Sequence, residues 1–158
     1  ECVVKGMMPG IGEPVFEKLD ANLAKAVMSI GAVKGVEIGD GFASAESFGS
    51  SNNDAFCLDQ DKHITKATNH AGGILGGISD GSDVILRAAV KPTPSIAKTQ
   101  QTVNRDKEPI AIEIGGRHDP IIVPRAVVVV EAMTAITVFD MMMESMSSNL
   151  DRIKRFFS

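Results

Sequence analysis

The side chains best suited to holding an anion fall in one short run after an apolar stretch. Lys91-Pro92-Thr93-Pro94-Ser95 supplies a cation, two hydroxyls and a backbone stiffened by two prolines. Such a set can hold phosphate oxygens, with the lysine ammonium acting as a point charge. An ordinary proline-rich exit from a strand has the same composition, and taken alone the run favours that structural interpretation.

A second run places a guanidinium, an imidazole and a carboxylate side by side. Arg117-His118-Asp119-Pro120 follows the Gly115-Gly116 break. An arginine can bind a phosphate or carboxylate through two parallel hydrogen bonds, and a carboxylate beside a ligand can accept or relay a proton. The alternative is a capping turn closed by a local arginine–aspartate pair.

A glycine-rich stretch has the spacing of a close-approach surface. Within Asn69 to Gly77, four glycines occupy six residues of a run that otherwise resembles a strand, namely Gly72, Gly73, Gly76 and Gly77. Glycine lets a flat ligand or another backbone come close, because it carries no side chain. A bulge or tight strand packing needs the same residues, and the sequence favours neither reading.

Two other patterns predict no site. Gly10-Ile11-Gly12-Glu13-Pro14-Val15 has the strand–loop–helix setting of a dinucleotide fingerprint, but Val15 replaces the third glycine and Pro14 removes an amide. We therefore predict a plain connection there. Cys2 and Cys57 form no CxxC pair and are expected to be reduced thiols, and the histidine spacing predicts no metal site.

The amino-acid composition limits which kinds of partner the chain can bind. Apolar residues make up 44% of the 158 residues, and aromatic residues only 4%, so the core must be aliphatic. A net charge of −4 leaves no basic surplus for nucleic acid or anionic lipid. The apolar stretch from Ala126 to Met143 contains Glu131 and Asp140, and a charge at a membrane helix centre costs about 3 kcal/mol. We predict a buried helix there, no membrane partner and no signal peptide.

The elements that must position these runs follow from periodicity and from turn residues. For the first half we predict a strand over 2–8, a helix from Pro14 that Gly31 ends, a strand over 33–38, a short helix over 42–46 and a long flexible loop over 48–68. For the second half we predict hairpins pairing 73–78 with 84–90 and 99–104 with 110–114, a helix over 124–143 and a frayed tail over 149–158. Together they predict antiparallel strand pairs and helices along 1–158, with no domain linker.

The runs occur in the order seen in one family. The chain resembles chorismate synthase over residues 1 to about 143, a likeness carried by several runs in register. These runs are Gly10 to Phe16, Ala32 to Phe42, Asn69 to Gly77, Lys91-Pro92-Thr93, Arg117-His118-Asp119-Pro120 with Pro124-Arg125-Ala126, and Glu131-Ala132-Met133. Each is weak alone, and their combination is specific.

The resemblance implies both a fold and a reaction. Members have an α+β fold that sandwiches helices between antiparallel sheets, and they form cytoplasmic homotetramers. Residues 1–158 would be the C-terminal portion of such a domain, an antiparallel sheet packed on helices that supplies half of the β-α-β sandwich. The implied reaction converts 5-enolpyruvylshikimate 3-phosphate into chorismate and phosphate by 1,4-elimination, a step of aromatic amino acid biosynthesis. Reduced FMN would lend an electron transiently and help accept the proton. NADP would enter only through flavin reduction, which the sequence leaves open.

Family roles transfer by position. The resemblance implies flavin contacts at Gly31, Ala32, Gly76, Lys91, Pro92, Thr93, Pro94, Ser95 and Arg117, and a proton-transfer role for Asp119. Three positions depart from the family: Gly31 stands where asparagine is frequent, Pro94 where serine is common, and Ile121 where a smaller residue is usual. We expect the glycine-rich edge, Lys91 and Arg117 to form one wall of a cleft for a planar, anionic cofactor.

The resemblance also implies that some of the family's catalytic and substrate-binding residues are absent from this chain. The family's N-terminal half carries two acid–base histidines and several substrate-binding arginines, which His63, His70 and His118 do not match. We therefore expect the isolated chain to be inactive and to bind FMN weakly or not at all. Two alternatives stay open at this point: a non-catalytic module that oligomerises or binds an anion, and a nicotinamide-dependent enzyme using Gly10 and Gly12.

Overall fold

A central antiparallel sheet of three strands organises the chain. The computed structural model describes all 158 residues, and its sheet has the order β1 (Cys2–Val4), β7 (Val84–Val90), β2 (Val33–Ile38). β2 occupies the predicted range, with a bulge between Val33 and Gly35. β1 is shorter than predicted, because its pairing with β7 ends where Val4 meets Val84, the first residue of β7.

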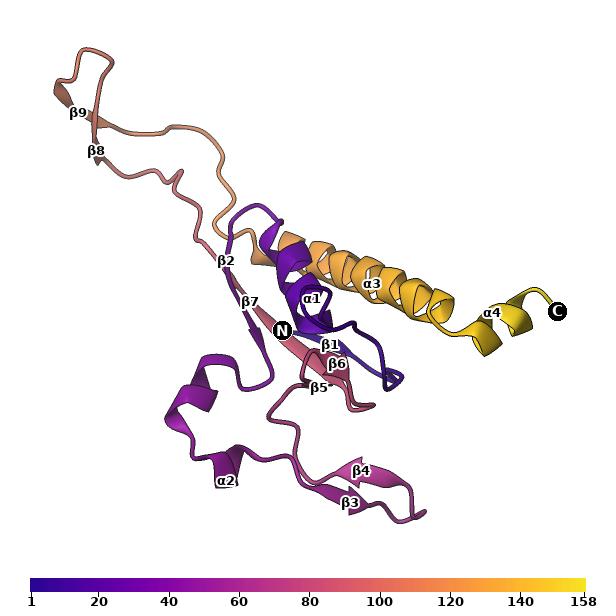
Figure 1. Cartoon of the computed structure of the whole chain (residues 1–158). Coiled ribbons are helices and arrows are strands. Elements are labelled where there is room, and N and C mark those ends of the chain that lie inside the picture. Colours follow the sequence, from indigo (N-terminus) through magenta and orange to yellow (C-terminus); the bar gives the residue numbers. More distant parts are fainter.

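Two helices cover one face of this sheet (Figure 1). α1 (Leu19–Met28) and α3 (Val123–Ser147) pack against each other, and α1 packs on β2. Leu19, Leu23 and Val27 recur every four residues along α1 and are fully buried, as expected for the apolar face of an amphipathic helix. Burying each such side chain contributes about 1.5–3 kcal/mol. The core is aliphatic throughout, comprising Met7, Ile11, Leu19, Leu23, Val27, Val33, Ile74, Val84, Leu86, Val138 and Met141.

The start and end of α1 differ from the prediction. The helix begins at Leu19 rather than Pro14, because Val15 has a left-handed backbone (φ +66°) that no helix accommodates. The amide of Leu19 donates instead to the carbonyl of Gly77 at 2.8 Å. The helix ends at Met28, before Gly31, and the left-handed residue after it is Ala32 (φ +71°).

The segment 41–68 is more ordered than predicted. A 3₁₀ helix, η1 (Gly41–Glu46), matches the short predicted helix. The predicted loop over 48–68 is wrong: it contains α2 (Gly49–Asn52) and a hairpin of β3 (Phe56–Leu58) with β4 (Ile64–Lys66). Its turn is local, because the Asp59 carboxylate accepts hydrogen bonds from the amides of Asp61 and His63 at 2.9 and 2.8 Å.

The first predicted hairpin is also wrong. β5 (Ile74–Leu75) pairs with β6 (Ile78–Ser79), while β7 pairs with β1 and β2 instead. The turn between β5 and β6 is Gly76-Gly77, with φ of +61° and +88°. A two-residue turn with two positive φ angles suits a tight hairpin and strongly favours glycine. The short predicted strand therefore folds on itself rather than onto β7.

The second predicted hairpin is confirmed and projects from the body as an arm (Figure 1). β8 (Gln100–Val103) pairs with β9 (Pro109–Ile112), and Asn104 accepts the amides of Asp106 and Glu108, both at 2.9 Å. At the C-terminus the predicted frayed tail is a capped helix, α4 (Leu150–Phe156), since the Asn149 side chain accepts two of its first amides. The α+β class predicted from the sequence is confirmed.

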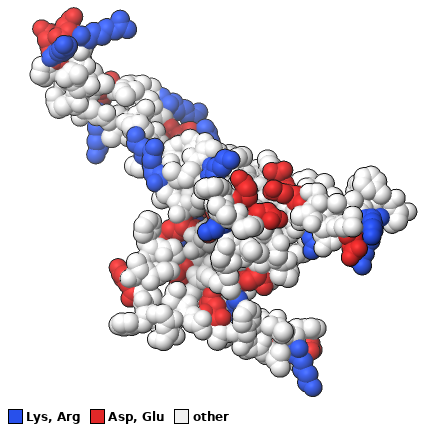
Figure 2. All heavy atoms as spheres, in the orientation of Figure 1, with Lys and Arg blue, Asp and Glu red and all other residues white.

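Much of the molecule's surface is uncovered. The accessible surface is 11201 Å², whereas a compact monomer of 16.7 kDa exposes about 7,600 Å². All seven phenylalanines are at least 64% exposed. α3 is long and apolar enough to cross a membrane by length and composition, and only part of it packs on α1 and the sheet. Figure 2 shows wide areas on one face without charged side chains.

Candidate functional site

Most of the predicted cofactor contacts gather at one end of the sheet. We call this region the arm base: Gly31–Ala32, Lys91–Ser95 and Arg117–Arg125. The Lys91 amide donates to the Ala32 carbonyl at 2.7 Å, which joins the first two segments. Val90 and Val123 line one hollow of about 270 Å³ between the sheet and α3, which places the start of α3, where the third segment ends, at the same end of the sheet.

The backbone at Ala32 is strained. A left-handed conformation costs an L-residue roughly 1–2 kcal/mol, and the contact with Lys91 holds it there. Strain of this kind concentrates at functional sites. Gly31 has an ordinary φ, and a Cβ built on it would meet nothing within 4 Å. A side chain at this position would therefore have room.

The Lys91–Ser95 segment leaves polar groups without partners. The hydroxyl oxygen of Thr93 is buried and has no hydrogen-bond partner, which costs roughly 1–3 kcal/mol in a closed interior. No carboxylate lies within ion-pair distance of Lys91 or of Arg117. An orphaned hydroxyl and two unpaired cations fit an anionic group such as a phosphate.

Asp119 is held by an arginine, although not by its neighbour in the run. Its two carboxylate oxygens accept from Arg125 at 2.7 and 3.3 Å, and Arg125 lies in the first turn of α3. The ring of His118 contacts the carbonyl of Ile114 at 3.2 Å. The local arginine–aspartate pair therefore forms through Arg125, which orients the Asp119 carboxylate and leaves Arg117 exposed and free.

The glycine-rich segment divides into packed and open positions. A Cβ on Gly72 or Gly73 would overlap the backbone of Gly39 or Asp83, and one on Gly77 would overlap the Lys18 side chain. Tight packing therefore explains three of the four glycines. At Gly76 a Cβ would meet nothing within 4 Å, so this position alone presents bare backbone to an open side.

The expected single wall does not form within this chain. The Gly72 carbonyl accepts from the Ile85 amide, near the start of β7, whereas Lys91 follows the end of that strand. Six residues of strand span about 20 Å. Gly76 lies beyond Gly72 in the β5–β6 turn, and thus at the opposite end of the sheet from the arm base. The structure brings Ala32, Lys91 and the start of α3 together and leaves Gly76 apart.

The Gly10–Gly12 loop has the geometry of a structural connection. The amides of Gly10 and Ile11 donate to the Ser79 carbonyl and hydroxyl at 2.8 and 2.9 Å. A Cβ on Gly12 would overlap the Gly77 carbonyl. These amides are occupied and α1 starts only at Leu19, so the loop offers no helix N-terminus to a pyrophosphate.

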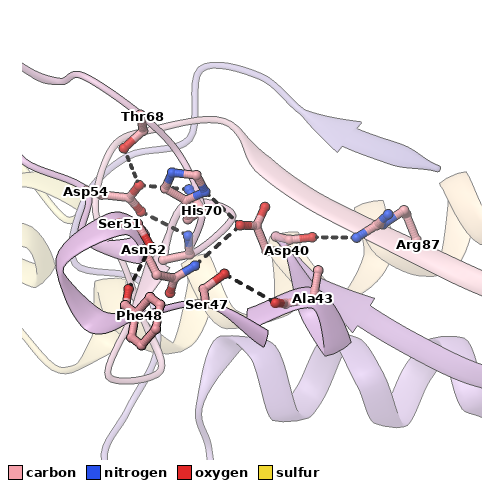
Figure 3. A network of polar contacts seen from close by, with 12 residues as sticks. Asp40, Ala43, Ser47, Phe48, Ser51, Asn52, Asp54, Thr68, His70 and Arg87 are labelled. Carbon is pink, nitrogen blue, oxygen red and sulfur yellow. Dashed lines mark hydrogen bonds and ion pairs between the residues drawn. The ribbon is translucent and has the colours of Figure 1, made fainter. Parts of the chain in front are cut away.

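Sequence reasoning missed a polar cluster beside the glycine-rich segment. Asp54 is 9% exposed and accepts three hydrogen bonds, and the ring of His70 pairs with Asp40 at 2.6 Å (Figure 3). Burial raises the pKa of Asp54, but hydrogen bonds from Ala71, Thr68 and His70 and the charge of Lys66 hold that pKa below its usual value. The only signal in the sequence was Asp54 itself, an aspartate within the 48–68 segment, which has no helical or strand periodicity.

The fold places this chain among α+β proteins, and the unpaired cations at the arm base make it a candidate for binding an anionic ligand. A family model for chorismate synthase matches residues 1–143, and the chain belongs to that family. It is 62% identical over 157 residues to the chorismate synthase of Lachnoclostridium phytofermentans and 61% identical over 144 residues to that of Archaeoglobus fulgidus. These alignments cover 99% and 90% of this chain.

The relatives are longer than the chain. It spans 43% of the Lachnoclostridium phytofermentans protein and 40% of the Archaeoglobus fulgidus protein. A crystal structure of a chorismate synthase superimposes with a TM-score of 0.70 at 31% identity, covering 98% of this chain and 39% of that one. The predicted family and fold class are therefore confirmed.

Proposed function

We propose that this chain forms part of an enzyme that converts 5-enolpyruvylshikimate 3-phosphate into chorismate and phosphate with reduced FMN. The observation that carries the proposal is the arm base, where Lys91, Arg117 and the buried Thr93 hydroxyl all lack partners. The reaction is a 1,4-elimination, in which the C–O bond to phosphate and one C–H bond break and a new double bond forms. It has no net redox change. Membership of the family supports it.

The roles of these residues are those that family membership implies. Lys91, Thr93 and Ser95 would bind the phosphate and ribityl oxygens of FMN, while Pro92 and Pro94 would keep that segment stiff. Gly31 and Ala32 offer backbone groups beside it, because Ala32 is tied to Lys91. Gly76 lies at the other end of this sheet, so it would meet a bound flavin only where the assembled homotetramer brings these two ends together.

Charge and proton handling fall to the third segment. Arg117 stabilises negative charge on the cofactor, as a preorganised cation does for charge that develops during a reaction. Asp119, oriented by Arg125, accepts or relays the proton. When bound, the reduced flavin supplies the electron density that weakens the bond to the leaving phosphate.

The rest of the longer protein covers what this chain leaves exposed. The excess surface of about 3,600 Å² over a compact monomer exceeds what one partner contributes to most stable interfaces. We infer that it is buried in the complete, cytoplasmic homotetramer and that the 158-residue chain alone does not turn over. His63 and His70 are committed to Asp59 and Asp40. A non-catalytic module is less well supported, because the family match runs through all the predicted contacts.

The test is a full-length chimera in which this chain replaces the matching segment of the Lachnoclostridium phytofermentans protein. Assayed without oxygen, with reduced FMN and 5-enolpyruvylshikimate 3-phosphate, it should release chorismate and phosphate in equal amounts. The isolated chain should release neither. A soluble, tetrameric chimera that binds both ligands without turnover would argue against the proposed function, and turnover by the isolated chain would contradict the need for a second half.

A further inference from the structure

The carboxylate of Asp54 organises the start of the glycine-rich segment. One oxygen accepts the Thr68 hydroxyl at 2.7 Å and the His70 amide at 2.8 Å, and the other accepts the Ala71 amide at 2.9 Å (Figure 3). All three donors lie in the four residues that lead into Gly72. Asp54 itself comes from the connection between α2 and β3, fourteen to seventeen residues earlier.

Neighbouring contacts tie the same residues to the end of β2. The Asp40 carboxylate binds the His70 ring at 2.6 Å and the Asn52 amide group at 3.3 Å. The Asp40 amide also donates to the His70 carbonyl at 2.8 Å. Figure 3 shows Asp40, Asn52, Asp54 and His70 converging in one cluster. His70 is therefore held through its ring, its amide and its carbonyl.

From this cluster, contacts run towards the open turn at Gly76. The amide of Gly73 donates to the Asn69 side chain at 2.7 Å, and its carbonyl accepts from Asp80 at 3.0 Å. Beyond the turn, the Gly77 carbonyl accepts from the first residue of α1. The turn is thus fixed on both sides, and the Asp54 contacts fix its N-terminal approach.

The backbone of the Asn69–Gly77 segment would be unusually mobile without contacts to other parts of the chain. Gly72, Gly73, Gly76 and Gly77 all have positive φ, between +61° and +88°. Glycine loses more conformational freedom on ordering than any other residue. Four such residues in six would sample many backbone conformations if the residues before them were free. A buried carboxylate with three donors supplies the restraint.

We propose that Asp54 is a positioning residue, which holds the Asn69–Gly77 segment and thereby keeps the bare backbone of Gly76 open to a flavin that the assembled enzyme brings to it. The identity of the ligand rests on the proposed function, whereas the restraint on the segment does not. Asp54 remains ionised above its depressed pKa and then only accepts hydrogen bonds, so each donor is matched. An asparagine would turn a donor towards Thr68 and His70 or towards Ala71.

The test compares two aspartates in the full-length chimera. Asp54→Asn disrupts long-range contacts, and Asp59→Asn is the matched control, because Asp59 accepts three contacts entirely within its own turn. Losing one charge-assisted hydrogen bond shifts an equilibrium by about 10- to 100-fold, here the one between the held and the free Asn69–Gly77 segment, and FMN affinity falls with the held fraction. We expect Asp54→Asn to weaken FMN binding at least about tenfold, while kcat at saturating FMN falls less than about threefold. Asp59→Asn should leave both unchanged.

Amide hydrogen exchange provides a readout without flavin. Exchange at residues 70–77 should be at least about tenfold faster in Asp54→Asn than in Asp59→Asn. Equal exchange in the two variants, or unchanged FMN affinity in a folded Asp54→Asn protein, would overturn the positioning role. If the unaltered chimera binds no FMN, the proposed function fails, yet the exchange comparison still decides the restraint.

A milder variant covers the case in which Asp54→Asn does not fold. Thr68→Val removes one donor and leaves both backbone donors of Asp54 in place. We expect it to fold, to exchange about threefold faster at residues 70–77 and to bind FMN about threefold more weakly. A folded Thr68→Val protein with unchanged exchange and unchanged affinity would refute the proposal.

Discussion

Replacing the buried Asp80 with asparagine should destabilise the protein far more than the same replacement of an exposed aspartate. The side chains of Asp80 and Lys66 form an ion pair and are only 8% and 3% exposed. The Lys66 ammonium also lies 5.6 Å from the centre of the Phe56 ring. The pair joins the β3–β4 hairpin to the turn before β7. Asparagine would keep the oxygen that accepts the Ser82 amide but would leave the ammonium buried without a counter-charge.

The magnitude follows from the burial of both partners. Removing one member of a buried ion pair costs roughly 3–5 kcal/mol, against a total stability of roughly 5–15 kcal/mol for a domain. Burial raises the pKa of Asp80, but the hydrogen bonds from Lys66 and Ser82 and the lysine charge outweigh burial and leave that pKa below its usual value.

The pH dependence has a definite sign. The folded pKa of Asp80 lies below the unfolded value of about 3.9. Its contribution is therefore complete above the unfolded pKa and is lost as the pH falls through the folded pKa. Asp54, whose pKa is also lowered, adds a loss of the same sign, so the unaltered protein should lose stability below about pH 4.

The assay is urea unfolding of the chimera followed by circular dichroism, since this chain has no tryptophan or tyrosine. Asp80→Asn should lower the free energy of unfolding by about 3–5 kcal/mol at pH 7 and flatten the acid loss. The double variant Lys66→Met with Asp80→Leu should recover most of the deficit, because no charge stays unpaired. A cost below about 1 kcal/mol for Asp80→Asn, or a double variant less stable than the single one, would refute this reasoning.

Two further substitutions test the packing by the same unfolding measurement. Gly39→Ala would force a Cβ into the backbone of His70 and Gly72 at a φ of +57°, and should cost at least about 2 kcal/mol; the matched Gly49→Ala, which faces open space, should cost under about 0.5 kcal/mol. Thr134→Val should stabilise the protein by about 1 kcal/mol, because the Thr134 hydroxyl is buried without a partner. A destabilised Thr134→Val protein, or an equally stable Gly39→Ala protein, would contradict these packing arguments.

Periodicity located the elements that carry the core. The four-residue stripe on α1, the strand β2 and the long helix α3 are visible in the sequence because each buries one continuous face. The start of α1 was not predictable, because it depends on the left-handed backbone of Val15 and on the long-range hydrogen bond from the Leu19 amide to the Gly77 carbonyl in the β5–β6 turn. The 48–68 segment has no period, since its short strands bury little and are held by side-chain hydrogen bonds.

The candidate site, too, was predictable from the sequence only in part. Residue types alone indicated an anion-binding set at Lys91–Ser95 and Arg117, and the structure ties Lys91 to Ala32 and places the start of α3 at the same end of the sheet. Residue types could not reveal that Gly76 lies at the other end of the sheet, because its position depends on which strands pair. Nor could it reveal that Arg125, six residues along the chain, is the partner of Asp119.

The most direct test of the account is the affinity of the chimera for FMN when single cations at the arm base are removed. Lys91→Met and Arg117→Met should each weaken FMN binding by about 10- to 100-fold, as expected for the loss of one charge-assisted contact. Lys98→Met, which removes an exposed lysine outside the predicted contacts, should leave the affinity unchanged. Equal FMN affinity in all three variants would contradict the assignment of the cofactor to the arm base.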